Sequence, residues 1–545
     1  MTRETISLAL AEGELAVARR GPSGIVATTS PADELPQLAA ALEAERPRWV
    51  WWSAEQTVAP LVAAGVQLAA CWDLAAVHRL LVGGRRDDPA AVEAAAQDRP
   101  VPPPLDAGLT LLRRDGSAAE VDEPSVTGLA VRALAVQRAQ QALLAGRPDP
   151  RPGAPAGAPP LAVLTAHAES AAALLAVELG QHGLPLSRPV AEQLLLRTIG
   201  PAGSSAASRD AEVLRHFLGT ADLRNPLQVR ELLRRNGFDV PDTRSWRLEP
   251  LRSSPGIAAL LGWRKVERVA TTYGWGWLDD HVRAGRLRGR WVASDGPGGR
   301  MTASAGLHNL PAELRGCVVA DPGHIFVRAD LGQIEPRVLA VVSGDPGLVA
   351  ATGEQDMYAP VARQLGVDRP TAKIAVLAAM YGQTSGPAAA ALARMKRAYP
   401  MAIDHLQQAE DRGRAGLDVQ TYGGRRVPMG GPAPADPARG RYARNAVVQG
   451  AAAEFFKAWA ATGAGRAVGV RGSDRALPAR RAAGARAGAE RRRRSGSAPR
   501  RPRQHCALVG RRERGPLRRS GHARPHLVRR HGVSARPAGC RWQGR

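Results

Sequence analysis

The stretch Val327-Arg328-Ala329-Asp330-Leu331-Gly332-Gln333-Ile334-Glu335-Pro336-Arg337 carries the strongest fold signal in this 545-residue chain. The apolar residues 325–329 predict a strand that ends at Asp330, Gly332 predicts a tight turn, and Pro336 predicts the start of a helix. A carboxylate at the end of a strand is held on a rigid edge. We therefore expect Asp330 to be available as a ligand for Mg²⁺.

A second segment, about forty residues later, places two cations and an aromatic ring at a spacing of four. Pro370 is a helix-start signal, and the run from 371 to 380 contains no Gly or Pro, so a helix is predicted over residues 369–380. Four residues then share one face of that helix: Arg369, Lys373, Leu377 and Tyr381. Cations beside a strand-end carboxylate suit a metal-bound triphosphate, and the ring suits a base.

These two segments resemble the motifs of a known enzyme family. Residues 330–337 are similar to motif A of family A DNA polymerases, usually written DYSQIELR, and residues 369–382 are similar to their motif B, R-x3-K-x7-YG. The resemblance implies that Asp330 and the Leu331 carbonyl bind metal, and that Arg369 and Lys373 neutralise the triphosphate. Asp330, Lys373 and Arg369 are thus the predicted catalytic residues.

The same resemblance implies a nucleotide site. Its predicted members are Gln333, Glu335, Arg369, Lys373, Leu377 and Tyr381. Glu335 would lie under the incoming sugar and exclude a 2′-hydroxyl. Single-subunit RNA polymerases share the Arg…Lys…Tyr-Gly helix but lack the Gln-Ile-Glu pattern, so Glu335 favours a DNA polymerase. Leu377 replaces the aromatic residue common in the family, and Asp356-Met357-Tyr358 stands where many members have Asp-x-His.

Three further segments imply contacts with primer-template DNA. Residues 299–311 resemble the family's TGRLSS…LQNIP segment, residues 418–428 resemble its ETLxGRRR hairpin, and residues 441–450 resemble R-x3-N-x3-Q-G of the palm helix. The Gly-Gly turn of the second segment also predicts a hairpin. The predicted DNA-binding residues are Arg300, Asn309, Arg337, Arg425, Arg426, Arg441, Asn445 and Gln449. The palm helix is expected to bury Val448, Ala452, Phe455 and Trp459.

The expected fold is multi-domain α/β: a right-hand polymerase with palm, thumb and fingers, preceded by a ribonuclease H-like exonuclease-type domain. The predicted units are a degenerate exonuclease-like domain (1–146), a Pro/Gly linker (147–160), a helical start of the polymerase (161–220), thumb (221–290), palm with motif A (291–345), fingers with motif B (346–435), palm helix (436–462) and an Arg-rich tail (463–545). The first domain has no Asp-x-Glu on an apolar strand, so we expect no exonuclease activity.

The tail separates the charge of the chain into two parts. From Arg466 onward there are 24 arginines, no lysine and three acidic residues, a net charge of +21 out of +25 for the whole chain. The tail also lacks motif C, the His-Asp-Glu triplet whose Asp would be the second metal ligand in the family. We favour a frameshift near residue 464 in a GC-rich gene. A genuine disordered, nucleic-acid-binding extension is the alternative.

The predicted function is template-directed DNA synthesis, in which a primer 3′-hydroxyl attacks the α-phosphate of a deoxynucleoside triphosphate. Two Mg²⁺ ions are expected, although only one carboxylate ligand is identified. A catalytically impaired primer-template DNA-binding protein is the alternative. Four scattered cysteines indicate neither disulfides nor zinc, and no signal peptide or membrane-length apolar run is evident. We expect a monomeric, cytoplasmic, nucleoid-associated protein.

Overall fold

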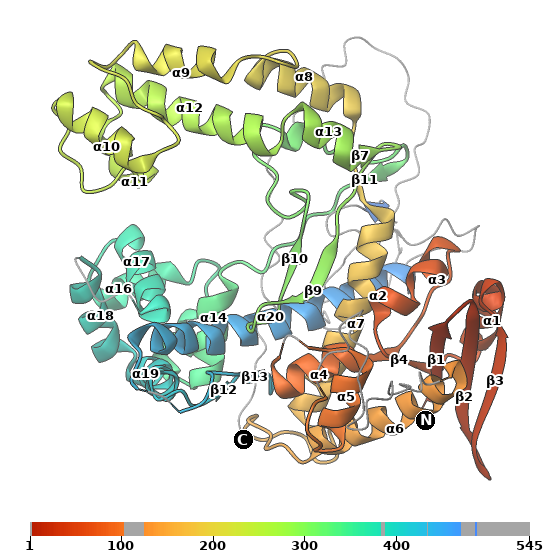
Figure 1. The fold of residues 1–545 in the computed structure, drawn as a ribbon. Coiled ribbons are helices and arrows are strands. Elements are labelled where there is room, and N and C mark those ends of the chain that lie inside the picture. Colours follow the sequence, from red (N-terminus) through yellow and green to blue (C-terminus); the bar gives the residue numbers. More distant parts are fainter. Residues whose placement is uncertain are drawn as a thin grey trace, which may run out of the picture.

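The computed structural model describes residues 3–102 except 85, 125–469 except 383–386 and 433, and 486–487. Figure 1 shows an α/β unit at the N-terminus, an upper arm of helices, a second group of helices facing that arm, and a long helix that crosses the centre. Most of the predicted tail, residues 463–545, lies outside the described residues.

The N-terminal unit is built on one mixed sheet in the order β3-β2-β1-β4-β5. β1 is antiparallel to β2 and parallel to β4, and β5 continues the parallel part. The strands are β1 (Thr5–Ala11), β2 (Glu14–Gly21), β3 (Gly24–Pro31), β4 (Arg48–Trp51) and β5 (Cys71–Asp73). The helices are α1 (Leu35–Glu43), α2 (Ala54–Thr57), α3 (Ala59–Ala63), α4 (Leu74–Val82), α5 (Pro89–Ala96) and α6 (Val126–Ala145). The predicted α/β pattern is confirmed.

Asp73 is the last residue of β5 and directly precedes α4. Its side chain is 1% exposed and caps α4, since Oδ1 accepts a hydrogen bond from Ala76 N at 2.7 Å. Its Oδ2 accepts from Ala54 N at 2.6 Å. Asp73 therefore connects helices to the sheet. Within the part of the chain that the structure describes, no three His, Cys, Asp or Glu side chains are grouped to hold a metal ion.

After a connector without helix or strand, α7 (Leu161–His182) runs through the middle of the protein and packs against β5, α4 and the central helix. It is long and apolar enough to cross a membrane by length and composition, but 61% of its most apolar window is buried inside the protein. This helix joins the N-terminal unit to the rest of the fold.

The upper arm in Figure 1 covers most of the predicted thumb. Its helices are α8 (Arg188–Ile199), α9 (Ala206–Leu214), α10 (Pro226–Arg235), α11 (Ser245–Leu248), α12 (Pro255–Thr272) and α13 (Trp275–His281). The short strands β6 (Leu184–Pro185), β7 (Val282–Arg283) and β8 (Arg286–Leu287) form a small sheet at its base. Both α10 and α12 lie within the residues expected for the thumb.

The facing group contains the segments that resemble motifs A and B. It consists of α14 (Ile334–Ser343), α15 (Pro346–Ala351), α16 (Tyr358–Leu365), α17 (Arg369–Tyr381), α18 (Pro387–Ala398), α19 (Pro400–Arg414) and the hairpin β12 (Val419–Gln420) with β13 (Arg426–Val427). The hairpin β9 (Trp291–Asp295) with β10 (Arg300–Ala303) stands between the two groups, and the central helix α20 (Pro437–Gly469) packs against α14, α17 and α19 of the facing group and against α7. β11 (His324–Ile325) pairs with β14 (Arg486–Ala487).

Candidate active site

Asp330 lies in an extended segment between β11 and α14, and its side chain is exposed. The predicted strand over residues 325–329 is wrong, because only His324 and Ile325 are in a strand. A strand persists only where a neighbour satisfies its backbone hydrogen bonds, and within the described residues β11 pairs with two residues of β14 alone. The segment still delivers Asp330 to the start of α14, as the sequence predicts.

The turn before α14 is made by Gln333 instead of Gly332. Gln333 has a φ of +59°, in the left-handed region, whereas Gly332 does not. Its side chain compensates with two hydrogen bonds: Nε2 donates to Asp356 Oδ1 at 2.8 Å, and Oε1 accepts from Met357 N at 2.8 Å. The prediction of Gly332 as the turn residue is corrected. Gln333 holds the start of α14 against the segment before α16.

α17 confirms the predicted helix. Asp368 caps it by accepting a hydrogen bond from Thr371 N at 2.9 Å. Arg369, Lys373 and Tyr381 are exposed and Leu377 is half-buried on one face. The other side is buried in the surrounding helices through Ala372, Ala375, Val376, Ala378, Ala379 and Met380. The structure thus presents Arg369 and Lys373 one turn apart and Tyr381 about two turns further along the same helix.

Arg369 is paired in this structure. Its Nε contacts Asp356 Oδ2, and its guanidinium carbon lies 5.7 Å from the centre of the Tyr358 ring. The bond to Arg369 lowers the pKa of Asp356, which keeps this carboxylate ionised. Asp356 therefore joins Gln333 of the motif A segment to Arg369 of the motif B helix. In the sequence, Asp356 is only the first residue of Asp356-Met357-Tyr358, in which Tyr358 departs from the Asp-x-His of many family members.

A second link joins the same two segments. Tyr381 Oη donates a hydrogen bond to Glu335 Oε2 at 2.9 Å. Burial and this hydrogen bond raise the pKa of Tyr381 to about 12, although the nearby positive charge of Arg300 opposes the shift. Glu335, Tyr381 and Arg300, from three separate segments, are thereby gathered at one place.

The structure contradicts the prediction that Arg337 binds DNA. Its guanidinium donates hydrogen bonds to four backbone carbonyls, those of Gly332, Thr352, Glu354 and Gln355. Burial lowers the pKa of Arg337. This side chain stabilises the loop between α15 and α16, so its donors are already used within the protein.

Arg425 is the second correction. The predicted hairpin is confirmed by β12 and β13, but the Arg425 side chain is 2% exposed and pairs with Glu169 at 2.8 Å. A template phosphate has no access to it. The neighbouring Arg426 is exposed and pairs with Asp418 at 2.6 Å.

The other predicted DNA-binding residues lie along the centre of the fold. Arg300 is exposed at the start of β10, and Asn309 is exposed with Oδ1 accepting from Tyr273 Oη at 2.7 Å. On α20, Arg441 is exposed while Asn445 and Gln449 are half-buried.

The predicted buried side of α20 is partly wrong. Val448 and Ala452 are buried, but Phe455 is 53% exposed. Trp459 is half-buried and stacks at a tilt on Phe456, with ring centres 5.7 Å apart.

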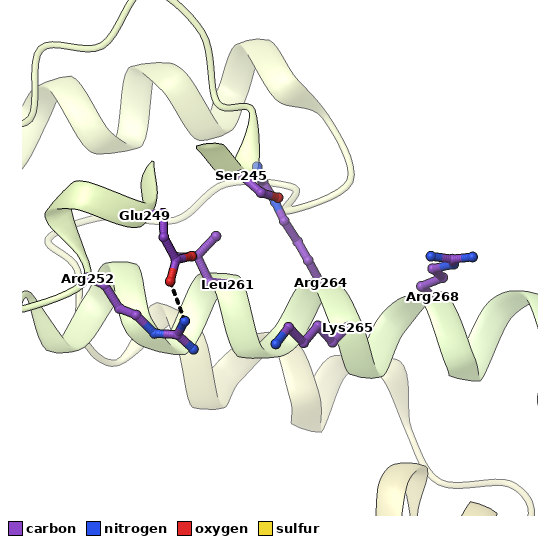
Figure 2. Close-up of a pocket in the computed structure, with 7 residues that line it drawn as sticks. All are labelled: Ser245, Glu249, Arg252, Leu261, Arg264, Lys265 and Arg268. Atoms are coloured by element: carbon purple, nitrogen blue, oxygen red, sulfur yellow. Dashed lines mark hydrogen bonds and ion pairs between the residues drawn. The ribbon is translucent and has the colours of Figure 1, made fainter. Parts of the chain in front are cut away.

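A basic pocket in the upper arm was missed at the sequence level. Figure 2 shows Arg264, Lys265 and Arg268 along α12, beside the pair formed by Arg252 and Glu249. The pocket has a volume of about 320 Å³ and is also lined by Ser245 and Leu261. Cations at positions i, i+1 and i+4 of a helix were the available signal. Arg268 also donates to the Asn309 carbonyl at 3.4 Å, which connects this arm to the centre.

Asp330 and the Leu331 carbonyl are oxygen donors of the kind that Mg²⁺ takes, and an exposed carboxylate leaves room for the water and phosphate oxygens that complete its shell. They fit one ion. For the predicted second ion, the described residues provide no further grouped acidic ligands.

The chain is similar to known proteins in both sequence and fold. Residues 219–464 match the profile of DNA polymerase family A. Less than half of the chain is thus similar to that family. The family match covers α10 to α13 of the upper arm, the motif A and B segments and α20 up to residue 464.

Two curated relatives agree with this assignment. DNA polymerase I of Chloroflexus aurantiacus is 30% identical over 314 residues, which are 51% of this chain and 33% of that protein. The thermostable DNA polymerase I of Thermus thermophilus is 30% identical over 248 residues, 38% of this chain and 29% of that protein. The chain therefore spans about a third of the length of these family A relatives.

The fold is also similar to that of a solved structure, the POL domain of Pol1 from M. smegmatis in complex with a DNA primer-template and dNTP. The TM-score is 0.59 at 19% identity, covering 86% of each chain. The fold is thus that of a family A polymerase domain.

Proposed function

We propose that this protein is a template-directed DNA polymerase that adds deoxynucleotides to a primer 3′-hydroxyl. The observation that supports this most is the hydrogen bond between Glu335 of the motif A segment and Tyr381 of α17, the helix that also carries Arg369 and Lys373, in a chain with a polymerase-like fold. We further propose a monomeric cytoplasmic protein that acts on nucleoid DNA.

The described side chains have distinct roles in this proposal. Lys373 and Arg369 neutralise the triphosphate, for which Arg369 exchanges Asp356 for phosphate oxygens. This exchange is feasible because the Arg369 side chain is 53% exposed. Leu377 and Tyr381 lie against the base. Glu335, held by Tyr381, occupies the space beneath the sugar and excludes a 2′-hydroxyl.

Asp330 and the Leu331 carbonyl would hold Mg²⁺, which when bound makes the primer hydroxyl a better nucleophile and stabilises the leaving pyrophosphate. The DNA would be gripped mainly through its backbone, by Arg300, Asn309, Arg426 and the polar face of α20. The cations of α12 add a contact with DNA phosphates on the thumb. We retain the prediction that residues 1–146 are a degenerate exonuclease-like domain, and that residues 463–545 are out of frame.

A catalytically impaired primer-template-binding protein is the second candidate. It is favoured by one feature of the sequence, which contains no His-Asp-Glu triplet.

Primer extension with Mg²⁺ and four deoxynucleotides, beside primer-template binding on the same sample, distinguishes the two candidates. Extension that is lost in Asp330→Ala and kept in Asp404→Ala, a matched change of an exposed aspartate on α19, supports the polymerase. Binding without extension supports the second candidate. Neither activity, from a folded sample, refutes both.

A further inference from the structure

A cluster of buried charges lies where α7, the β12–β13 hairpin and α20 meet. Glu169 Oε2 is 2.6 Å from Lys457 Nζ and 2.8 Å from Arg425 Nη2. The side chains of Glu169, Lys457 and Arg425 are 1%, 0% and 2% exposed. The Glu169 carboxylate on α7 thus joins two cations, Arg425 of the β12–β13 hairpin and Lys457 of α20.

A fourth buried group ties the hairpin to α20. Glu454 accepts hydrogen bonds from the Thr421 hydroxyl and from Gly423 N, the latter at 3.0 Å. Thr421 Oγ1 in turn accepts from the backbone N of Arg425 at 2.9 Å. The loop that carries Arg425 is therefore held by both its backbone and its side chain.

The Arg425 guanidinium supports the turn between β9 and β10. Gly299 has a φ of +65°, and a Cβ atom placed on it would overlap the guanidinium of Arg425. A Cβ atom on the preceding Gly298 would lie 3.2 Å from Gln449 Oε1. The turn thus rests directly on Arg425 and Gln449, and Arg300 is the next residue after it.

A planar guanidinium with a fixed partner is a rigid support, whereas lysine has a flexible stem and a smaller charged head. Buried ion pairs contribute little net stability compared with apolar residues of the same volume. A positioning role therefore explains this buried cluster better than a contribution to stability does. We propose that Arg425 is a positioning residue for DNA binding: held by Glu169, it sets the Gly298–Gly299 turn so that Arg300 faces the primer-template. This inference rests on the proposed function.

The test is a double-mutant cycle read out as primer-template affinity, measured by fluorescence anisotropy at several salt concentrations. Arg425→Lys keeps a cation beside Glu169 but removes the planar support. We expect Arg425→Lys and Arg300→Ala each to weaken binding about tenfold and to reduce the salt dependence by about one phosphate contact. The double variant should be at most about twofold weaker than Arg300→Ala alone, because both changes remove the same contact.

Arg426→Ala is the matched control, since it alters the adjacent but exposed arginine. In the double variant of Arg426→Ala and Arg300→Ala, the fold-loss of primer-template affinity should equal the product of the two single losses. If Arg425→Lys lowers the yield of folded protein, Glu169→Gln replaces it in the cycle, because that change weakens the anchor of Arg425 while keeping its guanidinium.

Two results would overturn the inference while leaving the proposed function intact. One is a double variant whose fold-loss of primer-template affinity equals the product of the losses of Arg425→Lys and Arg300→Ala. The other is an unchanged affinity in Arg425→Lys. Failure of the unaltered protein to bind primer-template would overturn both.

Discussion

Glu454→Gln should change how the stability of this protein depends on pH. Burial raises the pKa of Glu454 from 4.5 to about 7. The folded state therefore holds this proton more tightly than the unfolded state does. The sign follows: the stabilisation from neutral Glu454 is present at low pH and is lost as the pH rises from about 4.5 through 7.

The magnitude follows from the two pKa values. Between pH 6 and pH 8, ionisation of Glu454 should lower the free energy of unfolding by about 1 to 2 kcal/mol. Burial also lowers the pKa of the adjacent Lys457 to about 8. Loss of that proton favours the folded state as the pH rises, and it offsets part of this loss over the same interval. The net loss for the unaltered protein is therefore about 1 kcal/mol.

The glutamine variant keeps the shape of the side chain and removes its titration. Its amide oxygen can accept from Gly423 N while its amide nitrogen donates to Thr421 Oγ1. The difference in unfolding free energy between the variant and the unaltered protein should thus grow by about 1 to 2 kcal/mol from pH 6 to pH 8.

Urea unfolding followed by tryptophan fluorescence at several pH values measures this difference. Glu45→Gln, a change of an exposed glutamate, is the matched control and should leave the difference constant. Parallel curves for Glu454→Gln and the unaltered protein would refute the reasoning, because they would mean that Glu454 does not titrate in this interval.

Three further outcomes are expected. Glu335→Ala should raise ribonucleotide incorporation relative to deoxynucleotide incorporation by at least about tenfold, a discrimination of ~1.4 kcal/mol, measured as a ratio of kcat/KM values; an unchanged ratio contradicts the role beneath the sugar. Lys373→Met should raise the KM for deoxynucleotides by about tenfold with little change in primer-template Kd, whereas a change in Kd alone would place Lys373 on the DNA. Arg337→Ala should cost about 2 to 4 kcal/mol of stability through its lost carbonyl contacts, seen as a lower Tm, and should leave the DNA affinity of the folded protein within about twofold; weaker binding at full stability would restore Arg337 as a DNA contact.

Local patterns in the sequence were enough to predict the helices of the site. A start signal at Pro370 and a spacing of four for Arg369, Lys373 and Tyr381 specify both α17 and its exposed face, because helix caps and side-chain directions depend on near neighbours. The hairpin of β12 and β13 follows from a Gly-Gly turn for the same reason.

Contacts between distant segments decided the rest. Arg425 and Arg426 are adjacent and chemically identical, yet one is buried against Glu169 of α7 and the other is exposed. Arg337 is occupied by carbonyls of a later loop, and Phe455 faces outward although the helical period placed it inward.

What the sequence alone determined, therefore, is the resemblance to a polymerase family, the order of the helices and the residues that share a face. Which arginines are free for DNA, where the left-handed turn falls, and how Asp356 and Glu335 link motif A to motif B were decided only by the tertiary structure. The physical reason is that burial and pairing of a charge depend on the groups that the fold brings against it, and those groups lie far away in the chain.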